Sequence, residues 1–128
     1  MIVIDLPMPP SANALWRSDH GRKPHPSIKY TDWINLADQL TMASRAIQQR
    51  PGGKPIDGPW EATVYLDRDR ANADIDNLGT KAVFDWLQSR EFVTNDKNCH
   101  AYSVRWTDAQ YAPSGCRVIL RAIEAKHG

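Results

Sequence analysis

The residues best suited to chemistry are the two aspartates of Asp74-Ile75-Asp76. In an extended segment, carboxylates at positions i and i+2 project from the same side, so both can hold one hard cation. Asp96 is the candidate third carboxylate. It lies in the turn after the helix that follows Asp76. This turn would return the chain toward the start of that helix if the strand at residues 100–107 pairs beside the strand at residues 60–67. Mg²⁺ held by so few carboxylates keeps waters, which leaves positions for a phosphate oxygen and an attacking hydroxide. The pattern predicts a Mg²⁺-dependent phosphodiester hydrolase, in which Mn²⁺ can substitute.

An Asp-x-Asp pair also occurs in three other settings, which are alternatives to a nuclease metal site. Asp76 or Asn77 is a natural cap for the helix that follows, and capping alone would explain an acidic residue there. The pair also occurs in glycosyltransferases, but the short chain and the missing nucleotide-sugar domain disfavour that class. A calcium loop counted from Asp74 would need a ligand where Leu78 stands and a glutamate where Asp85 stands, so this class is also disfavoured.

Lysine and arginine residues supply the expected contacts to a polyanion. Lys81 lies one to two turns into the helix opened by Asp76, where its ammonium could orient the attacking water or neutralise the phosphate. The alternative is an ordinary exposed helix lysine. Long cations on loops beside the expected site are predicted to contact phosphates, and these are Arg17, Arg22, Lys23 and Arg70. A solvated surface with scattered charges would show the same composition.

The composition fits a single domain spanning residues 1–128. Hydrophobic residues make up 41% of the chain, and the formal net charge of +1 does not by itself indicate a nucleic-acid binder. No apolar run approaches the roughly 20 residues that span a bilayer, and the first residues lack the features of a signal peptide, so a cytoplasmic protein is expected. Cys99 and Cys116 are too few and too far apart for a disulfide scaffold or a zinc site, which predicts two ordinary thiols.

The hydrophobic periodicity predicts an α+β fold, with a mixed β-sheet and two main helices packed on it. Alternating apolar residues predict strands at residues 1–6, 60–67, 100–107 and 117–123. Apolar residues three and four apart predict helices from about Thr31 to Gln49 and from Asp76 or Asn77 to about Ser89. Asn13 to Ser27 is predicted to be an exposed loop, because Pro24 and Pro26 oppose regular structure.

Three patches of the sequence resemble the RusA-type Holliday junction endonucleases of phages, prophages and bacteria. The first runs from Leu6 to Arg17 and contains Pro7-Met8-Pro9-Pro10-Ser11-Ala12-Asn13. The second contains Asp74-Ile75-Asp76-Asn77, Lys81 and Phe84-Asp85-Trp86-Leu87. The third is Phe92-Val93-Thr94-Asn95-Asp96. Together they occur in the family's order over most of residues 4 to 104, which is far more specific than Asp-x-Asp alone.

The resemblance implies a homodimer that binds four-way DNA junctions and resolves them by paired symmetric nicks with Mg²⁺, as in DNA recombination and repair. It implies that Asp74, Asp76 and Asp96 are the catalytic metal ligands and that Lys81 is the essential lysine. Asn13 and Asn77, within the first two patches, are expected to contact DNA. The chain departs from the family at two points. Lys81 follows Asp76 by five residues instead of four, which a bulge near Gly79-Thr80 could absorb, and Asn95-Asp96 replaces two acidic residues.

The sequence leaves the exact activity open. A structure-selective endodeoxyribonuclease is the main expectation. A non-catalytic module on the same fold, binding flaps or other branched DNA, is the alternative, and a divalent-metal glycosyltransferase is the weakest of the three.

Overall fold

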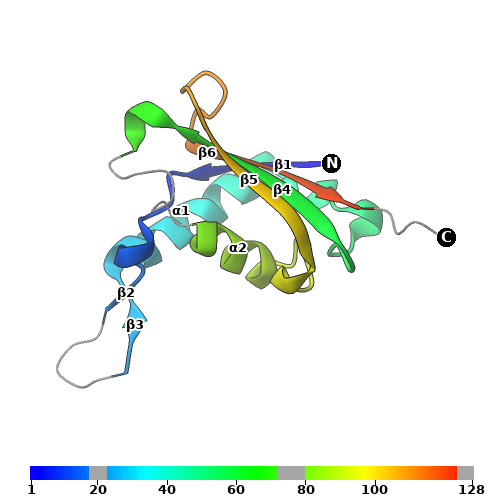
Figure 1. Cartoon of the computed structure of the whole chain (residues 1–128), viewed down its shortest axis with the longest axis horizontal. Coiled ribbons are helices and arrows are strands. Elements are labelled where there is room, and N and C mark those ends of the chain that lie inside the picture. Colours follow the sequence, from blue (N-terminus) through cyan, green and yellow to red (C-terminus); the bar gives the residue numbers. More distant parts are fainter. Residues whose placement is uncertain (18–22, 72–79, 124–128) are drawn as a thin grey trace.

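A four-stranded mixed sheet forms one layer of the molecule, and two helices cover one of its faces (Figure 1). This computed structural model describes residues 1–17, 23–71 and 80–123. The strand order is β1-β6-β4-β5, in which β4 and β5 are parallel and the other neighbours are antiparallel. The strands are β1 (Ile2–Pro7), β4 (Trp60–Asp67), β5 (Cys99–Thr107) and β6 (Gly115–Ala122), and the helices are α1 (Ile28–Ser44) and α2 (Thr80–Ser89). The predicted α+β fold with a mixed sheet and two main helices is confirmed.

The strands form where apolar residues alternate, and the alternation determines which face of the sheet is buried. In β4, every second residue from Trp60 to Leu66 is buried, whereas Glu61, Thr63 and Tyr65 are only partly covered. In β5, Tyr102, Val104 and Trp106 share one face, because they pair with the core residues Ala62, Val64 and Leu66 of β4. Alternation therefore predicts both the strands and their inward faces.

Helix α1 begins earlier and ends sooner than the periodicity indicates. It begins at Ile28 because the Ser27 hydroxyl accepts a hydrogen bond from the Tyr30 N–H at 3.1 Å, which caps its first turn. It ends at Ser44 because Arg45 adopts a left-handed conformation, with φ of 57°. The residues after Arg45 form a short 3-10 helix, η2 (Ala46–Gln49), so the predicted single helix is two elements in sequence.

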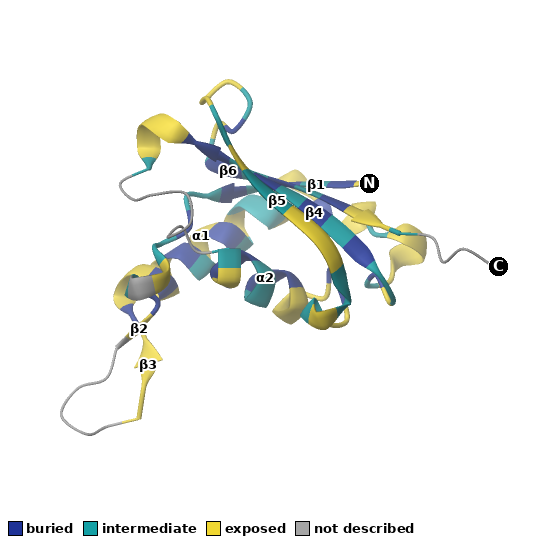
Figure 2. Ribbon diagram, viewed as in Figure 1, coloured by how far each residue is buried: buried dark blue, intermediate teal, exposed yellow. Residues whose placement is uncertain are grey.

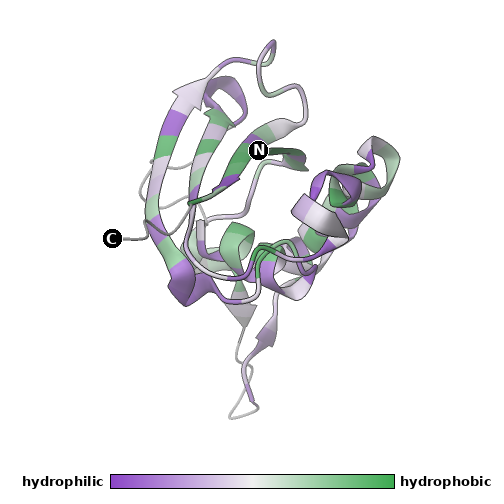
Figure 3. Cartoon of the chain, turned by 90° about the vertical axis from the view of Figure 1, so that its right-hand side faces the viewer, coloured by the Kyte–Doolittle hydropathy of each residue, from purple (hydrophilic) through white to green (hydrophobic). Residues whose placement is uncertain are grey.

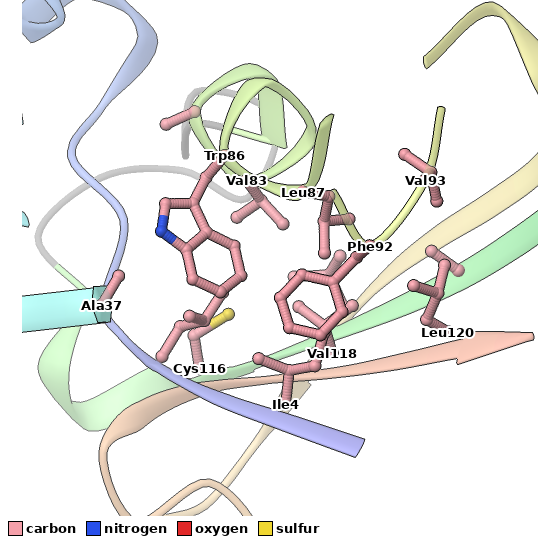
Figure 4. Packing of buried hydrophobic residues seen from close by; sticks show 14 of the residues in the cluster. Ile4, Ala37, Val83, Trp86, Leu87, Phe92, Val93, Cys116, Val118 and Leu120 are labelled. Carbon is pink, nitrogen blue, oxygen red and sulfur yellow. The ribbon is translucent and has the colours of Figure 1, made fainter. Parts of the chain in front are cut away.

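Helix α2 packs its apolar stripe onto the sheet and supplies much of the core (Figure 4). Trp86 and Leu87 are buried, and the Trp86 ring stacks on Phe92 with centroids 5.4 Å apart. Cys116 on β6 is buried in the same core, and its burial raises the pKa of the thiol. Cys116 and Cys99 are free cysteines, as predicted.

The predicted loop from Asn13 to Ser27 is wrong in part, because its two ends form a paired ribbon. A single 3-10 turn, η1 (Ala12–Ala14), leads into β2 (Trp16–Arg17), which pairs antiparallel with β3 (His25–Pro26). Proline is tolerated in β3 because a two-stranded ribbon consists only of edge strands. The β2–β3 ribbon projects away from the sheet and helices, and its β3 strand is exposed (Figure 2).

The sheet face opposite the helices carries polar and charged residues among apolar ones (Figure 3). Arg117 of β6 donates to Asp5 of β1 at 2.8 Å and lies over the Tyr111 ring, 5.0 Å from its centroid. Arg121 forms a second cross-strand ion pair with Glu61. Such pairs keep this face compatible with solvent.

In the parts of the chain that the structure describes, no helix is both long enough and apolar enough to cross a membrane.

Candidate metal and nucleic-acid site

The first turn of α2 carries Lys81 on the side of the helix that faces away from the core. Ala82 and Val83 are buried against the sheet, whereas the Lys81 side chain is 66% exposed. Its Nζ lies 3.7 Å from Oδ2 of Asp85, one helical turn further on. An exposed i,i+4 pair contributes only about 0.3–0.5 kcal/mol. The ammonium can therefore leave Asp85 at little cost and turn to a phosphate.

Asp96 begins the single turn η5 (Asp96–Asn98), which two neighbouring elements hold in place. The Asn95 side chain caps this turn by accepting from the Lys97 N–H at 2.9 Å. The Asp96 N–H donates to Oε1 of Gln88 at 2.9 Å, which ties the turn to the end of α2. The Asp96 carboxylate is partly exposed and has no hydrogen bond in the described regions of the chain, so its oxygens remain available to a cation.

The strand that follows α2 pairs beside the strand that precedes it, but the expected return of the turn toward the start of α2 is wrong. The Asp96 N–H is bonded to Gln88 in the last turn of α2, so the turn lies at the other end of that helix. The pairing of β4 and β5 is parallel, and this determines which end of β4 lies nearby. The Trp60 indole N–H donates to the Asn95 carbonyl at 3.1 Å, so the turn lies beside the start of β4. The candidate ligands Asp74 and Asp76 follow the other end of β4 in the sequence and precede α2.

Part of the expected site lies outside the described residues. These positions are Asp74, Asp76, Asn77 and the proposed bulge residue Gly79; Arg22 of the basic stretch also lies outside. Across residues 1–17, 23–71 and 80–123, no three His, Cys, Asp or Glu residues gather closely enough to hold a metal ion. The structure therefore gives positions for Asp96 and Lys81 but not for the complete expected set.

The remaining expected DNA contacts fall on two elements. Asn13 lies in η1 and Arg17 in β2. Lys23 is exposed and lies just before β3 in the sequence. Arg70 ends the 3-10 turn η4 (Arg68–Arg70) that follows β4. Its Nε lies 3.4 Å from Oδ2 of Asp67, and its side chain is 46% exposed, so the outer nitrogens can still reach an anion.

The alternation along β4 would place Asp67 on the outward face with Glu61, Thr63 and Tyr65, but Asp67 is buried. It is only 1% exposed, because the chain turns there and covers it. Its carboxylate caps η4 by accepting from the Asp69 N–H at 3.1 Å and pairs with Arg70. Arg68 of the same turn lies over the Trp106 ring, 5.9 Å from its centroid. An acidic residue at the end of a strand, followed by two arginines, is the only sequence signal of this arrangement.

A further group that the sequence did not indicate joins α1 to α2. Asp38 of α1 accepts from the Trp86 indole N–H at 2.9 Å, and from Nε and Nη2 of Arg90 at 2.7 and 2.8 Å. The Arg90 hydrogen bond holds the pKa of Asp38 below its usual value against the opposing effect of burial, and the same bond raises the pKa of Arg90. We call Asp38, Trp86 and Arg90 the inter-helix network.

Comparison of the chain with models of known protein families and with curated proteins gives no match.

Proposed function

We propose that this chain is a Mg²⁺-dependent endodeoxyribonuclease of the RusA type, which resolves four-way DNA junctions by paired symmetric nicks. Asp74, Asp76 and Asp96 are the proposed metal ligands, and Lys81 is the proposed phosphate-binding lysine.

The observation that carries this proposal is that the three sequence patches of the resemblance meet around α2. The first patch includes η1, which lies against α2 although more than sixty residues separate them in sequence. The third patch packs against α2 through Phe92, stacked on Trp86, and through Asp96, bonded to Gln88. The three patches are therefore parts of one assembly around α2, which supports a common function, although Asp96 lies at the end of this helix that is remote from Lys81.

The donor set suits Mg²⁺, because carboxylate oxygens are the ligands this hard cation takes in proteins. When bound, the ion would supply a polarised water and a counter-charge for the phosphate. Asp96 is tied to α2 through its backbone, which leaves both carboxylate oxygens available. Among the residues that the structure describes, Lys81 is bound only by the weak pair with Asp85, and it can neutralise charge on the phosphate as the bond breaks.

The exposed cations are proposed to position the DNA through its phosphates. Lys23 and Lys29 are exposed at the β2–β3 ribbon and the first turn of α1, and Arg68 and Arg70 are exposed after β4. A net charge of +1 makes a uniform attraction to DNA weak, so binding depends on these local groups.

Paired nicks require two active sites, and we propose a two-fold dimer. The sheet has one blocked and one open edge. At the β1 edge, the Gln49 side-chain amide binds both the N–H and the C=O of Val3, at 2.9 and 3.4 Å. In the described part of the chain, β5 has β4 on one side and no strand on the other, and it exposes 57% of Tyr102. The β5 edge is therefore the better candidate for contact with a second copy.

A non-catalytic module that binds branched DNA is the second candidate, favoured by the pairing of Lys81 with Asp85. The protein should be incubated with labelled junction, flap and duplex DNA, with Mg²⁺ and with EDTA. Junction cleavage that requires Mg²⁺ is expected. Binding without cleavage would favour the module, and neither binding nor cleavage would overturn both.

A further inference from the structure

A hollow of about 260 Å³ lies between the β2–β3 ribbon and the two helices. Its apolar walls are Trp16 and Pro26 of the ribbon, Tyr30 and Ile34 of α1, and Trp86 of α2. The Trp16 and Tyr30 rings meet edge to face with centroids 6.0 Å apart. Pockets for drug-sized ligands occupy about 300–1,000 Å³, so this hollow suits something smaller, such as one flat ring system.

The exposure of Trp16 needs an explanation. Its side chain is 48% exposed, whereas Trp33, Trp60 and Trp86 are each 3% exposed or less. A large aromatic side chain on a projecting ribbon contributes little to the core and is a common feature of binding surfaces. One side of Trp16 already contacts Tyr30, and the rest of the ring is available to a ligand that enters the hollow.

Polar groups line the same hollow and could bind the edge of a heterocycle. Asp85, Ser89 and Arg90 contribute to its wall. Asp85 uses Oδ2 for the pair with Lys81, which leaves Oδ1 to accept a hydrogen bond from an amino group. Burial and the nearby Asp85 carboxylate raise the pKa of Tyr30, so its hydroxyl stays protonated and able to donate.

Lysine side chains near the hollow indicate that the heterocycle would belong to a molecule that carries phosphates. Lys23 and Lys29 are exposed on the ribbon and on the first turn of α1, close in sequence to the wall residues Pro26 and Tyr30. Lys81 lies one helical turn from Asp85. An aromatic hollow beside cations is the combination that binds single-stranded nucleic acid, with bases on the rings and phosphates on the lysines.

We propose that the hollow between Trp16 and Trp86 receives one unstacked DNA base, which stacks on Trp16 and offers its amino group to Asp85. The inference rests on the proposed function for its source of DNA, since bases at a branch point are less firmly stacked than those in a duplex. Adenine, guanine and cytosine have an exocyclic amino group and thymine has none, so the hollow favours the first three.

Short oligonucleotides test this without cleavage. The whole protein is titrated, in EDTA, with fluorescently labelled eight-nucleotide strands of deoxycytidine or of thymidine, and with an abasic phosphodiester strand of equal length. The deoxycytidine strand should bind about tenfold tighter than the abasic one, as expected for one base stacked on an aromatic ring. Trp16→Ala should remove this difference and Trp16→Phe should keep most of it. Met42→Ala, another exposed apolar side chain on α1 outside the hollow, should behave as wild type.

Asp85→Leu provides a second variant, which removes the acceptor and leaves the aromatic wall intact. It should reduce the ratio of deoxycytidine affinity to thymidine affinity, because the loss of one negative charge affects both strands alike. The slope of log affinity against log salt should be the same for wild type and Trp16→Ala, because both keep the phosphate contacts.

Equal binding of the deoxycytidine and abasic strands, or a Trp16→Ala variant that binds as wild type, would overturn the base site. Neither result would affect the proposed function if the wild-type protein cuts junctions with Mg²⁺. Conversely, a protein that cuts no DNA but binds bases through Trp16 would refute the nuclease and support the base site.

Discussion

Asp38→Ala removes the acceptor of the inter-helix network and should destabilise the fold measurably. The change deletes two hydrogen bonds from Arg90 and one from the Trp86 indole. The side chains of Asp38 and Arg90 are 36% and 41% exposed, so their ion pair should contribute at most about 1 kcal/mol. The hydrogen bond from the Trp86 indole adds about 0.5 kcal/mol, the lower end of the usual range for one hydrogen bond.

Asp38→Ala should therefore lower the free energy of unfolding by about 1.5 kcal/mol. A chain of 128 residues has an unfolding entropy on the order of 270 cal/mol/K, so Tm should fall by about 6 °C. Thermal unfolding followed by circular dichroism measures this. Asp32→Ala is the matched control, because Asp32 is an exposed aspartate of the same helix.

The destabilisation should depend on pH in a definite direction. Because the pKa of Asp38 is lowered in the folded protein, its contribution is complete above the unfolded value of about 3.9 and is lost as pH falls through the folded value. The difference between wild type and Asp38→Ala should thus be constant at neutral pH and shrink below about pH 4. Equal Tm values for Asp38→Ala and Asp32→Ala at pH 7 would refute the role of the network.

Three further changes test the site and the fold. Asp76→Asn should abolish Mg²⁺-dependent cleavage while junction binding in gel shifts is kept or tightened, because one repelling charge near the phosphates is gone; normal cleavage would exclude Asp76 as a ligand. Replacing Arg22 and Lys23 together by alanine should weaken junction binding and reduce the slope of log affinity against log salt by up to about two. An unchanged slope would show that neither residue contacts a phosphate. Gly115→Ala should lower the free energy of unfolding by more than Gly58→Ala, since both have positive φ but only at Gly115 would the new Cβ lie 2.8 Å from the Met8 nitrogen; equal losses in urea denaturation would contradict this.

Hydrophobic periodicity was sufficient to predict the sheet and the helices. Strands β1, β4 and β6 alternate between buried and less buried residues over most of their length, as from Trp60 to Leu66, and a local pattern of this kind needs no knowledge of the partner strand. The end of α1 was missed because Arg45 adopts a left-handed conformation that glycine or asparagine usually indicates. The ribbon was missed because each of its strands has only two residues, too few to show a period, and one of these residues is Pro26.

The candidate site was predicted less completely than the fold, because it depends on tertiary pairing. The expectation for Asp96 depended on pairing of β5 with β4, which the sequence offered only as a condition. The direction of that pairing decides which end of β4 lies near Asp96, and no local pattern encodes that direction. The inter-helix network could not be predicted for a similar reason. Asp38 and Arg90 are separated by 52 positions, and each by itself resembles an ordinary charged residue on a helix surface.

The most direct test of the proposed nuclease is a cleavage map at nucleotide resolution. A four-way junction labelled on each strand in turn is incubated with the wild-type protein and Mg²⁺, and the products are sized on a denaturing gel beside those of Asp76→Asn. The proposal predicts two nicks at symmetric positions in opposite strands, absent in EDTA and absent with Asp76→Asn. An intact junction, or the same nicks produced by Asp76→Asn, would contradict it.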